Sequence, residues 1–427
     1  MKKWRGVSTV VLAVMSVLAV ASSQAKNDNI VPGFFIVTLR QEVNVEEVTR
    51  DHGLVPDAVF TRALRGFAGA LPAAKLAALR ADPRVRAVEP DRVVSLVHPV
   101  KIVEAVATTA GETLPTGVDR IDAEMHPRTD VSGVGIAIID TGIWKTHSDL
   151  NVVGGYNCTS VNTANWTDDN GHGTHVAGIA AAKAGNDLGV RGVAPNARLY
   201  AVKVLNKSGS GNLSWIIKGI DWVTANAASK NIRVANMSLG FEGTSAALDA
   251  AISNSVAAGV TYVVAAGNSA KDASTFSPAN HPLVITVSAI ADSNGRCGGG
   301  GPSTGYGDDD TFASFSNWGS PVDLAAPGVN IYSTYLGSKK NPNGGYATMS
   351  GTSMAAPHVA GAAAQYLASN PSATPAEVRE ALRANGIPQS IACVGSTGNG
   401  GFTGDPDHAL GDDTSALAEP LVYVPGL

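Results

Sequence analysis

The chain has little charge, few cysteines and no long apolar run. Only 16% of its 427 residues are charged, whereas 44% are hydrophobic. Its 31 basic side chains are outnumbered by 36 acidic ones and form no basic stripe, which argues against a nucleic-acid binder. No stretch reaches the roughly 20 apolar residues of a membrane-spanning helix. The 47 glycines show no fixed period, which excludes a fibrous repeat and leaves a globular chain with a sizeable core.

The three cysteines are Cys158, Cys297 and Cys393, and an odd number cannot pair completely. Cys297 and Cys393 both lie in Gly-rich segments, so we prefer a disulfide between them. No cysteine has the spacing of a metal site or lies in a nucleophile motif. The acidic run at 308–310 is interpreted as a solvated loop.

The first 25 residues are typical of a secretory signal peptide. Three basic residues precede an apolar run at 10–20, and small residues follow at 23 and 25. A membrane anchor is the alternative, but it needs a longer apolar run. We therefore expect a secreted protein with no membrane attachment once 1–25 is removed.

Two patterns divide the rest of the chain. Residues 26–106 combine strand-like and helix-like segments in a small α+β unit, followed by a weakly patterned linker. Residues 107–427 alternate apolar strands with helices, which predicts an α/β domain of three layers, a mainly parallel sheet flanked by helices. Its active site should lie where the strands end. The last segment, 391–427, is either a covering extension or a second trimmed piece.

Four polar residues stand where such a site is expected. Asp140 follows the apolar run 135–139, and Asn268 ends another apolar strand. His172 and Ser353 each begin a helix rich in small residues. Each has a plain structural alternative as a cap or turn residue. His172 with His175 could also suggest a metal pair, but metalloprotease helices space their histidines by four with a Glu between, so His175 is interpreted as structural.

The four residues together indicate a catalytic site far more specifically than any one of them does alone. A serine hydroxyl is a poor nucleophile until a base removes its proton, and the base needs a carboxylate to fix its tautomer. The segments around Asp140, His172, Asn268 and Ser353 resemble the signature motifs of the subtilisin (subtilase) family, over a region from about Leu114 to at least Leu367. The resemblance implies a subtilisin-like fold and a serine endopeptidase that forms an acyl-enzyme.

The resemblance also implies a role for each residue. His172 would accept the proton of Ser353 and later protonate the leaving amine, while Asp140 orients the imidazole. Asn268 and the backbone N–H of Ser353 would bind the oxyanion. Two alternatives are a non-catalytic relative and a secreted adhesion module. A non-catalytic relative would lack one of the four groups, and all four are present. An adhesion module would leave the presence of these four groups unexplained.

Two segments resemble the family's substrate-binding edges, which hold an extended peptide as an added strand. The residues of these two edges are Gly209, Ser210, Gly211, Ser238, Leu239 and Gly240. The wall of the S1 pocket would also include Ala265 and Gly267. Since no acidic residue lies in these walls, we expect broad specificity with an apolar preference at P1. Glu242 lies close enough to the rim to add some tolerance for basic side chains.

A structural Ca²⁺ site is also implied by resemblance. Asp149 and Asn186 would give side-chain oxygens, and Ala184, Leu188 and Val190 would give carbonyl oxygens. The loop is one residue longer than the family's usual spacing, and a plain polar turn is the alternative.

The N-terminal unit, 26–106, resembles the family's inhibitory propeptide, chiefly at 33–39 and 88–91. This implies a zymogen inhibited by its own N-terminal domain and cut between about His98 and Thr113. The other partners expected are protein or peptide substrates, with no nucleic acid, and the mature enzyme is expected to be a monomer.

Overall fold

The structure, a computed structural model, describes residues 29–96, 103–106, 111–128, 130–339, 341–393, 400–406 and 418–427. The expected signal peptide and much of the expected processing region lie outside these residues. Among the described residues, no helix combines the length and apolar character needed to cross a bilayer.

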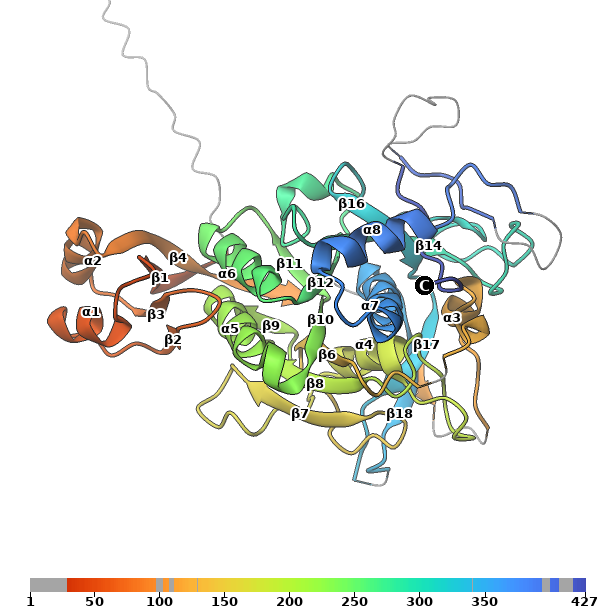
Figure 1. The fold of residues 1–427 in the computed structure, drawn as a ribbon, viewed down its shortest axis with the longest axis horizontal. Helices are drawn as coiled ribbons and strands as arrows, with labels where there is room; N and C mark the ends of the chain where they lie inside the picture. The colour runs from red at the N-terminus through yellow and green to blue at the C-terminus, as the bar shows by residue number, and fades with distance from the viewer. Residues whose placement is uncertain are drawn as a thin grey trace, which may run out of the picture.

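The N-terminal unit is a separate α+β lobe (Figure 1). It consists of β1 (Ile30–Leu39), α1 (Val45–Asp51), β2 (Ala58–Phe60), β3 (Gly66–Ala70), α2 (Ala73–Ala81) and β4 (Val85–Leu96). β1 pairs antiparallel with both β3 and β4. Asn44 caps the start of α1, because its side chain accepts hydrogen bonds from two backbone N–H groups of the first turn. Val37, Val48, Phe67 and Leu79 form the buried core of the lobe.

The second unit is built on a sheet with strand order β15-β14-β12-β10-β6-β8-β7, with β16 also paired to β14. Its members are β6 (Gly135–Asp140), β7 (Val152–Asn157), β8 (Arg198–Lys203), β10 (Ile232–Met237), β12 (Thr261–Ala265), β14 (Ile285–Ala291), β15 (Thr311–Phe312) and β16 (Val322–Pro327). All neighbours are parallel except β14 and β15. The mainly parallel sheet predicted from the apolar runs is confirmed.

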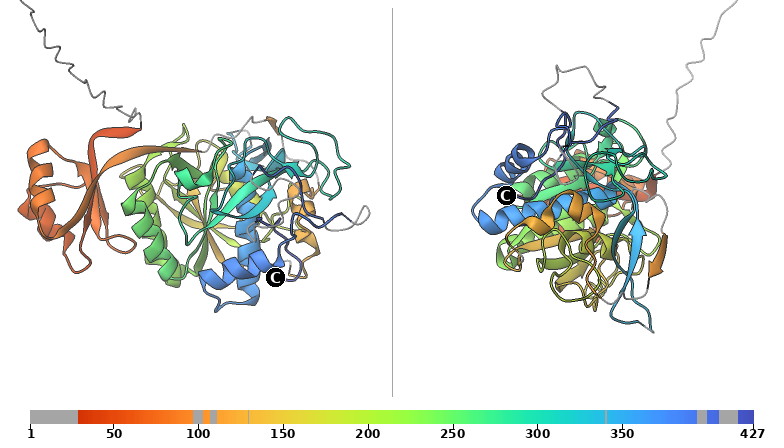
Figure 2. Two further views of the ribbon diagram at one scale, coloured as in Figure 1. Left: turned by 90° about the horizontal axis from the view of Figure 1, so that it is seen from above. Right: turned by 90° about the vertical axis from the view of Figure 1, so that its right-hand side faces the viewer.

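Helices cover both faces of this sheet (Figures 1 and 2). α5 (Leu213–Lys230) and α6 (Ala246–Ala257) lie on one face, and α4 (His172–Ala181) and α7 (Thr352–Ser369) on the other, with α8 (Pro375–Asn385) against α7. In β6, Ile136 and Ile138 join the core under α4 and α7, whereas Ala137 and Ile139 join the core under α5 and α6. A strand buried on both faces is apolar throughout, which explains the continuous run at 135–139.

The remaining elements are short. They are β5 (Val103–Val106), α3 (Thr116–Arg120), η1 (Ala123–Met125), β9 (Ser210–Asn212), β11 (Leu239–Glu242), η2 (Ala273–Thr275), β13 (Phe276–Ser277), β17 (Ile331–Tyr335) and β18 (Gly345–Met349). β17 and β18 form a hairpin that β5 extends. β9 and β11 both pair with β4, so the last strand of the N-terminal lobe runs into the second unit.

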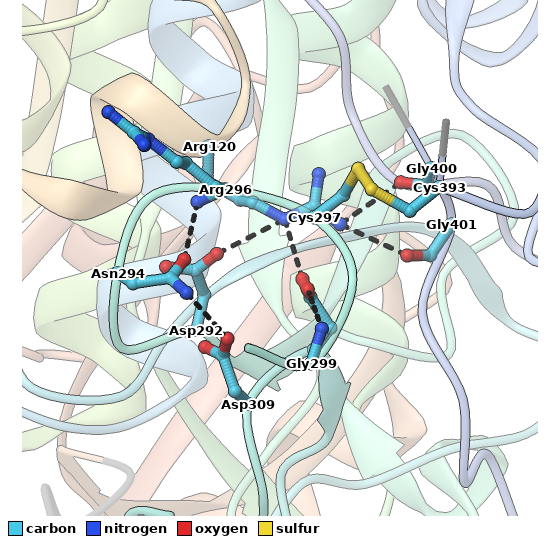
Figure 3. The surroundings of a disulfide bond; sticks show 11 residues. Arg120, Asp292, Asn294, Arg296, Cys297, Gly299, Asp309, Cys393, Gly400 and Gly401 are labelled. Atoms are coloured by element: carbon cyan, nitrogen blue, oxygen red, sulfur yellow. Dashed lines mark hydrogen bonds and ion pairs between the residues drawn. A yellow bond between two sulfur atoms is a disulfide. The ribbon is translucent and has the colours of Figure 1, made fainter. Parts of the chain in front are cut away.

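The C-terminal segment is tied to the body of the protein by a disulfide (Figure 3). Cys297 is joined to Cys393 across 96 residues of sequence, as preferred from the sequence. The third cysteine, Cys158, is buried and outside any disulfide. Phe402 and Leu421 complete a small apolar core with Ile290 of β14, so the described part of 391–427 packs against the central sheet.

The interpretation of 308–310 as a solvated loop was wrong for two of its three carboxylates. Asp309 and Asp310 are buried. The guanidinium of Arg120 pairs with Asp310 at 2.7 Å. It also pairs with Asp292 at 3.1 Å and donates to the carbonyls of Gly400 and Gly401 (Figure 3). A buried cation shared by two carboxylates offsets the desolvation that makes isolated buried charges rare.

Candidate active site

Asp140 and His172 are brought together at the carboxyl end of the central sheet. Asp140 is the last residue of β6, and His172 is the first of α4. His172 Nδ1 lies 2.9 Å from both carboxylate oxygens of Asp140, and both side chains are buried. An Nδ1–H that donates to the carboxylate leaves Nε2 unprotonated in the neutral ring. The pair can therefore present a general base.

Ser353 lies in the first turn of α7, after Gly351. Its Oγ donates to the carbonyl of Ser238 at 3.3 Å. Within the described ranges, His172 Nε2 has no hydrogen-bond partner. Catalytic hydrogen bonds often form fully only in the substrate complex, so this geometry is compatible with a Ser–His pair that closes on binding.

Asn268 follows β12 and reaches the same end of the sheet. Its amide oxygen accepts hydrogen bonds from the Thr352 backbone N–H at 2.9 Å and from Thr352 Oγ1 at 2.7 Å. With the oxygen held in this way, the amide nitrogen supplies the donors of this side chain. Sequence analysis missed Thr352, although this residue directly precedes Ser353 in the chain.

The two predicted substrate-binding edges lie on either side of an extended strand, and that strand is the end of β4. Val94 pairs with Gly211, and Leu96 pairs with Leu239. Leu96 N–H also donates to the Gly209 carbonyl at 2.8 Å. The protein thus holds its own N-terminal segment as the middle strand between β9 and β11.

The two residues predicted to line the S1 pocket lie where β12 ends. Ala265 is its last residue, and Gly267 follows with φ 114°. A Cβ at Gly267 would lie 2.2 Å from Asn317 Nδ2, so both the backbone angle and the packing require glycine there. Glu242, expected near the rim, is 3.2 Å from Lys271 Nζ in an exposed ion pair that offsets its charge.

Two carboxylates of β4 fasten the N-terminal lobe to the starts of α5 and α6. Asp91 accepts from the backbone N–H of Ser214 at 3.0 Å and its Oγ at 2.6 Å. Glu89 accepts from Ser245 Oγ at 2.6 Å and Ala247 N–H at 3.3 Å. Helix N-termini favour negative charge, whereas desolvation by burial raises the pKa of both carboxyl groups.

The residues of the expected calcium loop meet around one buried carboxylate. Asp149 accepts from Asn186 Nδ2 at 2.8 Å and from the Val190 N–H at 3.0 Å, and burial raises its pKa to about 6. Leu188 N–H donates to Asn186 Oδ1 at 3.1 Å. Glu112, which sequence analysis missed, accepts from Gly185 N–H at 2.6 Å on the same loop.

The side-chain oxygens at this loop are too few to bind a hard cation without main-chain carbonyl oxygens. Within the described part of the chain, no three His, Cys, Asp or Glu side chains cluster to hold a metal. Carbonyl oxygens, such as those of Ala184, Leu188 and Val190, would have to complete the shell, as is usual for Ca²⁺. A bound cation would also compensate the buried Asp149 carboxylate, so the residues fit Ca²⁺.

His175 lies away from any metal-like arrangement with His172. Its Nε2 is 3.0 Å from the Ile331 carbonyl and 2.9 Å from the Ala347 carbonyl. Burial lowers its pKa to about 3, so the ring is neutral and ties α4 to the β17–β18 hairpin. This agrees with the structural interpretation of His175.

The chain is similar to known protein families and to individual proteins. Residues 131–410 match the Subtilase family, and residues 56–97 match Peptidase inhibitor I9. The chain is 41% identical over 348 residues to alkaline serine exoprotease A of Vibrio alginolyticus, an alignment that covers 79% of this chain and 58% of that protein. It is 42% identical over 309 residues to subtilisin E of Bacillus subtilis, covering 71% of each.

The chain is also similar to a protein of solved structure. A cold adapted subtilisin-like serine proteinase is 36% identical, with a TM-score of 0.53, and its alignment covers 72% of this chain and 97% of that one.

Proposed function

The chain belongs to the subtilase family of serine proteases, with a peptidase inhibitor I9 unit before the protease domain, and we propose that it is a secreted endopeptidase made as a self-processing zymogen. The observation that carries the proposal is the Asp140–His172 pair at 2.9 Å, with Ser353 at the start of the neighbouring helix α7. The chain's own β4 lies between the strands that would bind substrate.

In the proposed reaction, Ser353 Oγ attacks the scissile carbonyl while His172 Nε2 takes its proton. The Asp140 carboxylate holds the Nδ1–H and stabilises the imidazolium without becoming protonated. His172 then gives the proton to the leaving amine, and the acyl-enzyme remains. A water molecule, deprotonated by the same nitrogen, hydrolyses the ester and restores Ser353.

The oxyanion of each tetrahedral intermediate would be bound by Asn268 Nδ2 and the Ser353 backbone N–H. The N-terminal turn of α7 supports this proposal because its first N–H groups lack partners within the helix. Loss of one such donor lowers kcat about 10²- to 10³-fold in subtilisin itself, and we expect a similar loss on Asn268→Ala.

The specificity proposed is broad, with an apolar preference at P1. Main-chain pairing with β9 and β11 is independent of side chains, which supports broad use. Val94 and Leu96, which occupy alternate positions of the bound β4 strand, are both buried, so the cleft accepts apolar side chains. The ion pair of Glu242 with Lys271 weakens any attraction for basic ones.

Inhibition by the N-terminal lobe is supported by the position of β4. β4 fills the position between β9 and β11 that a substrate strand would take, and His172 and Ser353 are 1% and 0% exposed in the full chain. β4 ends opposite Leu239, next to Ser238, whose carbonyl accepts the Ser353 hydroxyl. The last strand of the lobe thus ends beside the segment that contacts the nucleophile, and the expected processing region, 98–113, follows it in the sequence. The signal-like segment 1–25 supports secretion, and we propose a monomer.

A structural Ca²⁺ ion is proposed at Asp149 and Asn186, completed by the carbonyls of Ala184, Leu188 and Val190. The ion would supply no chemistry to the reaction. It would hold the loop that follows α4 against the loop before β7 and so stabilise the domain.

A fluorophosphonate probe tests the proposed function. We expect the processed protein to be labelled and to lose casein hydrolysis in proportion, and we expect no label on the Ser353→Ala variant. An unlabelled processed protein without caseinolysis would contradict the proposal.

A further inference from the structure

A buried carboxylate beside the triad takes no part in the reaction proposed above. Asp168 is 1% exposed and lies in the loop before α4. It accepts five hydrogen bonds, from Thr141 Oγ1 at 2.9 Å, Asn170 N at 2.9 Å, Gly171 N at 3.0 Å, Thr174 N at 3.0 Å and Thr174 Oγ1 at 2.5 Å. A carboxylate with this many partners is fixed in one orientation.

Thr141 connects Asp168 to both members of the Asp–His pair. It directly follows Asp140, and its Oγ1, which donates to Asp168, accepts from Gly173 N–H at 2.9 Å. Gly173 directly follows His172. One hydroxyl group thus joins the end of the strand that carries Asp140 to the start of the helix that carries His172.

The contact between β6 and α4 is close. A Cβ on Gly173 would lie 2.2 Å from the Gly142 carbonyl oxygen and 3.2 Å from Asp140 Oδ1. Gly171, at the N-cap of α4, has no side chain to satisfy the first turn. Asp168 does so instead by accepting the Thr174 N–H.

The strand end is also held by a lysine of β8. Lys203 Nζ donates to the Thr141 carbonyl at 2.6 Å and the Leu205 carbonyl at 2.9 Å, and it pairs with Asp169, next to Asp168, at 2.6 Å. The backbone at Thr141 therefore has little freedom, and Asp168 ties the start of α4 to it through the Thr141 hydroxyl.

We propose that Asp168 is a positioning residue of the protease, which acts through Thr141 to hold Asp140 and His172 in register. This inference rests on the proposed function. The five hydrogen bonds of Asp168 go to Thr141 and to residues 170–174, and none of them involves the side chains of Asp140, His172 and Ser353 or the strands β9 and β11. Asp168 thus sets the position of the His172 ring against the Asp140 carboxylate.

Asp168→Asn keeps the size of the side chain but turns one acceptor into a donor. Both carboxylate oxygens face N–H or O–H donors, so either orientation of the amide places an NH₂ group against another donor. The start of α4 must shift, and a misplacement of about 1 Å can cost on the order of 100-fold in rate. We expect kcat to fall roughly 10- to 100-fold, with KM changed less than about twofold.

The test compares Asp168→Asn, Thr141→Val and Thr141→Ser in the full-length chain, with kinetics on a chromogenic peptide after processing. Thr141→Val should match Asp168→Asn, Thr141→Ser should recover most of kcat, and the double variant Asp168→Asn with Thr141→Val should be little worse than either alone. A variant that processes too slowly to yield mature enzyme is compared with the wild type by its rate of self-cleavage and its thermal midpoint.

Asp323→Asn is the matched control. Asp323 is equally buried and accepts from Thr286 N–H at 3.0 Å and from two arginines, but it lies in β16. It should lower the thermal midpoint with kcat unchanged. The inference is overturned if Asp168→Asn keeps kcat within about threefold of the wild type, or if Asp323→Asn loses as much kcat. A wild type that no fluorophosphonate labels would instead refute the proposed function.

Discussion

Thr352 offers a quantitative check on the proposed oxyanion site. Thr352→Val is nearly isosteric and removes the hydroxyl that lies 2.7 Å from Asn268 Oδ1, while the backbone N–H at 2.9 Å remains. A neutral hydrogen bond contributes about 0.5–1.5 kcal/mol, so the Asn268 amide loses about that much of the free energy that holds it in place. We expect kcat to fall roughly 3- to 10-fold, since 1.4 kcal/mol corresponds to about tenfold. KM should change less than kcat because β9 and β11 are untouched, although the same hydroxyl also accepts from the N–H of Gly267 at 3.2 Å.

The assay is hydrolysis of a chromogenic peptide by enzyme whose active sites have been titrated. Thr352→Ser should restore kcat. In the Asn268→Ala background, Thr352→Val should have almost no further effect, because the side chain that Thr352 holds is gone. An equal loss in both backgrounds would show that Thr352 acts independently of Asn268 and would refute the reasoning.

Three further predictions concern stability. A calcium chelator should lower the thermal midpoint of the wild type but not that of Asp149→Asn, and an unchanged wild-type midpoint would remove the calcium proposal. Burial lowers the pKa of His175 to about 3 and that of His358 to about 4, so the stability that these neutral rings provide should be lost as pH falls below about 6.5. A pH series of thermal midpoints checks this, and a flat profile from pH 7 to 4 would contradict it. Burial and the nearby Asp405 raise the pKa of Glu419, so stability should fall as pH rises, and Glu419→Gln should raise the thermal midpoint under alkaline conditions; a lower midpoint for the variant there would contradict this.

Local patterns were sufficient to locate the ends of the elements that carry the site. The apolar run before Asp140 is a strand buried on both faces, and small residues after His172 and Ser353 let α4 and α7 pack closely. Gly361 of α7 illustrates this, since a Cβ there would lie 2.9 Å from the Ala180 carbonyl of α4. Such features depend on neighbours in sequence or on periodicity, so they can be predicted without the fold.

Contacts between distant segments could not be predicted in this way. Asp168 and Thr352 are ordinary polar residues until the fold places Thr141 and Asn268 beside them. The burial of Asp310 depends on Arg120, 190 residues earlier in the chain, so an acidic run that is usually solvated became a buried ion-pair network. Each of these depends on a partner that no local pattern identifies.

Conversion of the purified precursor tests the central claim most directly. Followed by intact mass and casein hydrolysis, the wild-type chain should lose its N-terminal unit at a rate independent of protein concentration at first, and activity should appear as the unit is degraded. Ser353→Ala should remain full length and inactive under the same conditions. If the Ser353→Ala chain shortens and gains activity as fast as the wild type, Ser353 is not the nucleophile and the account is wrong.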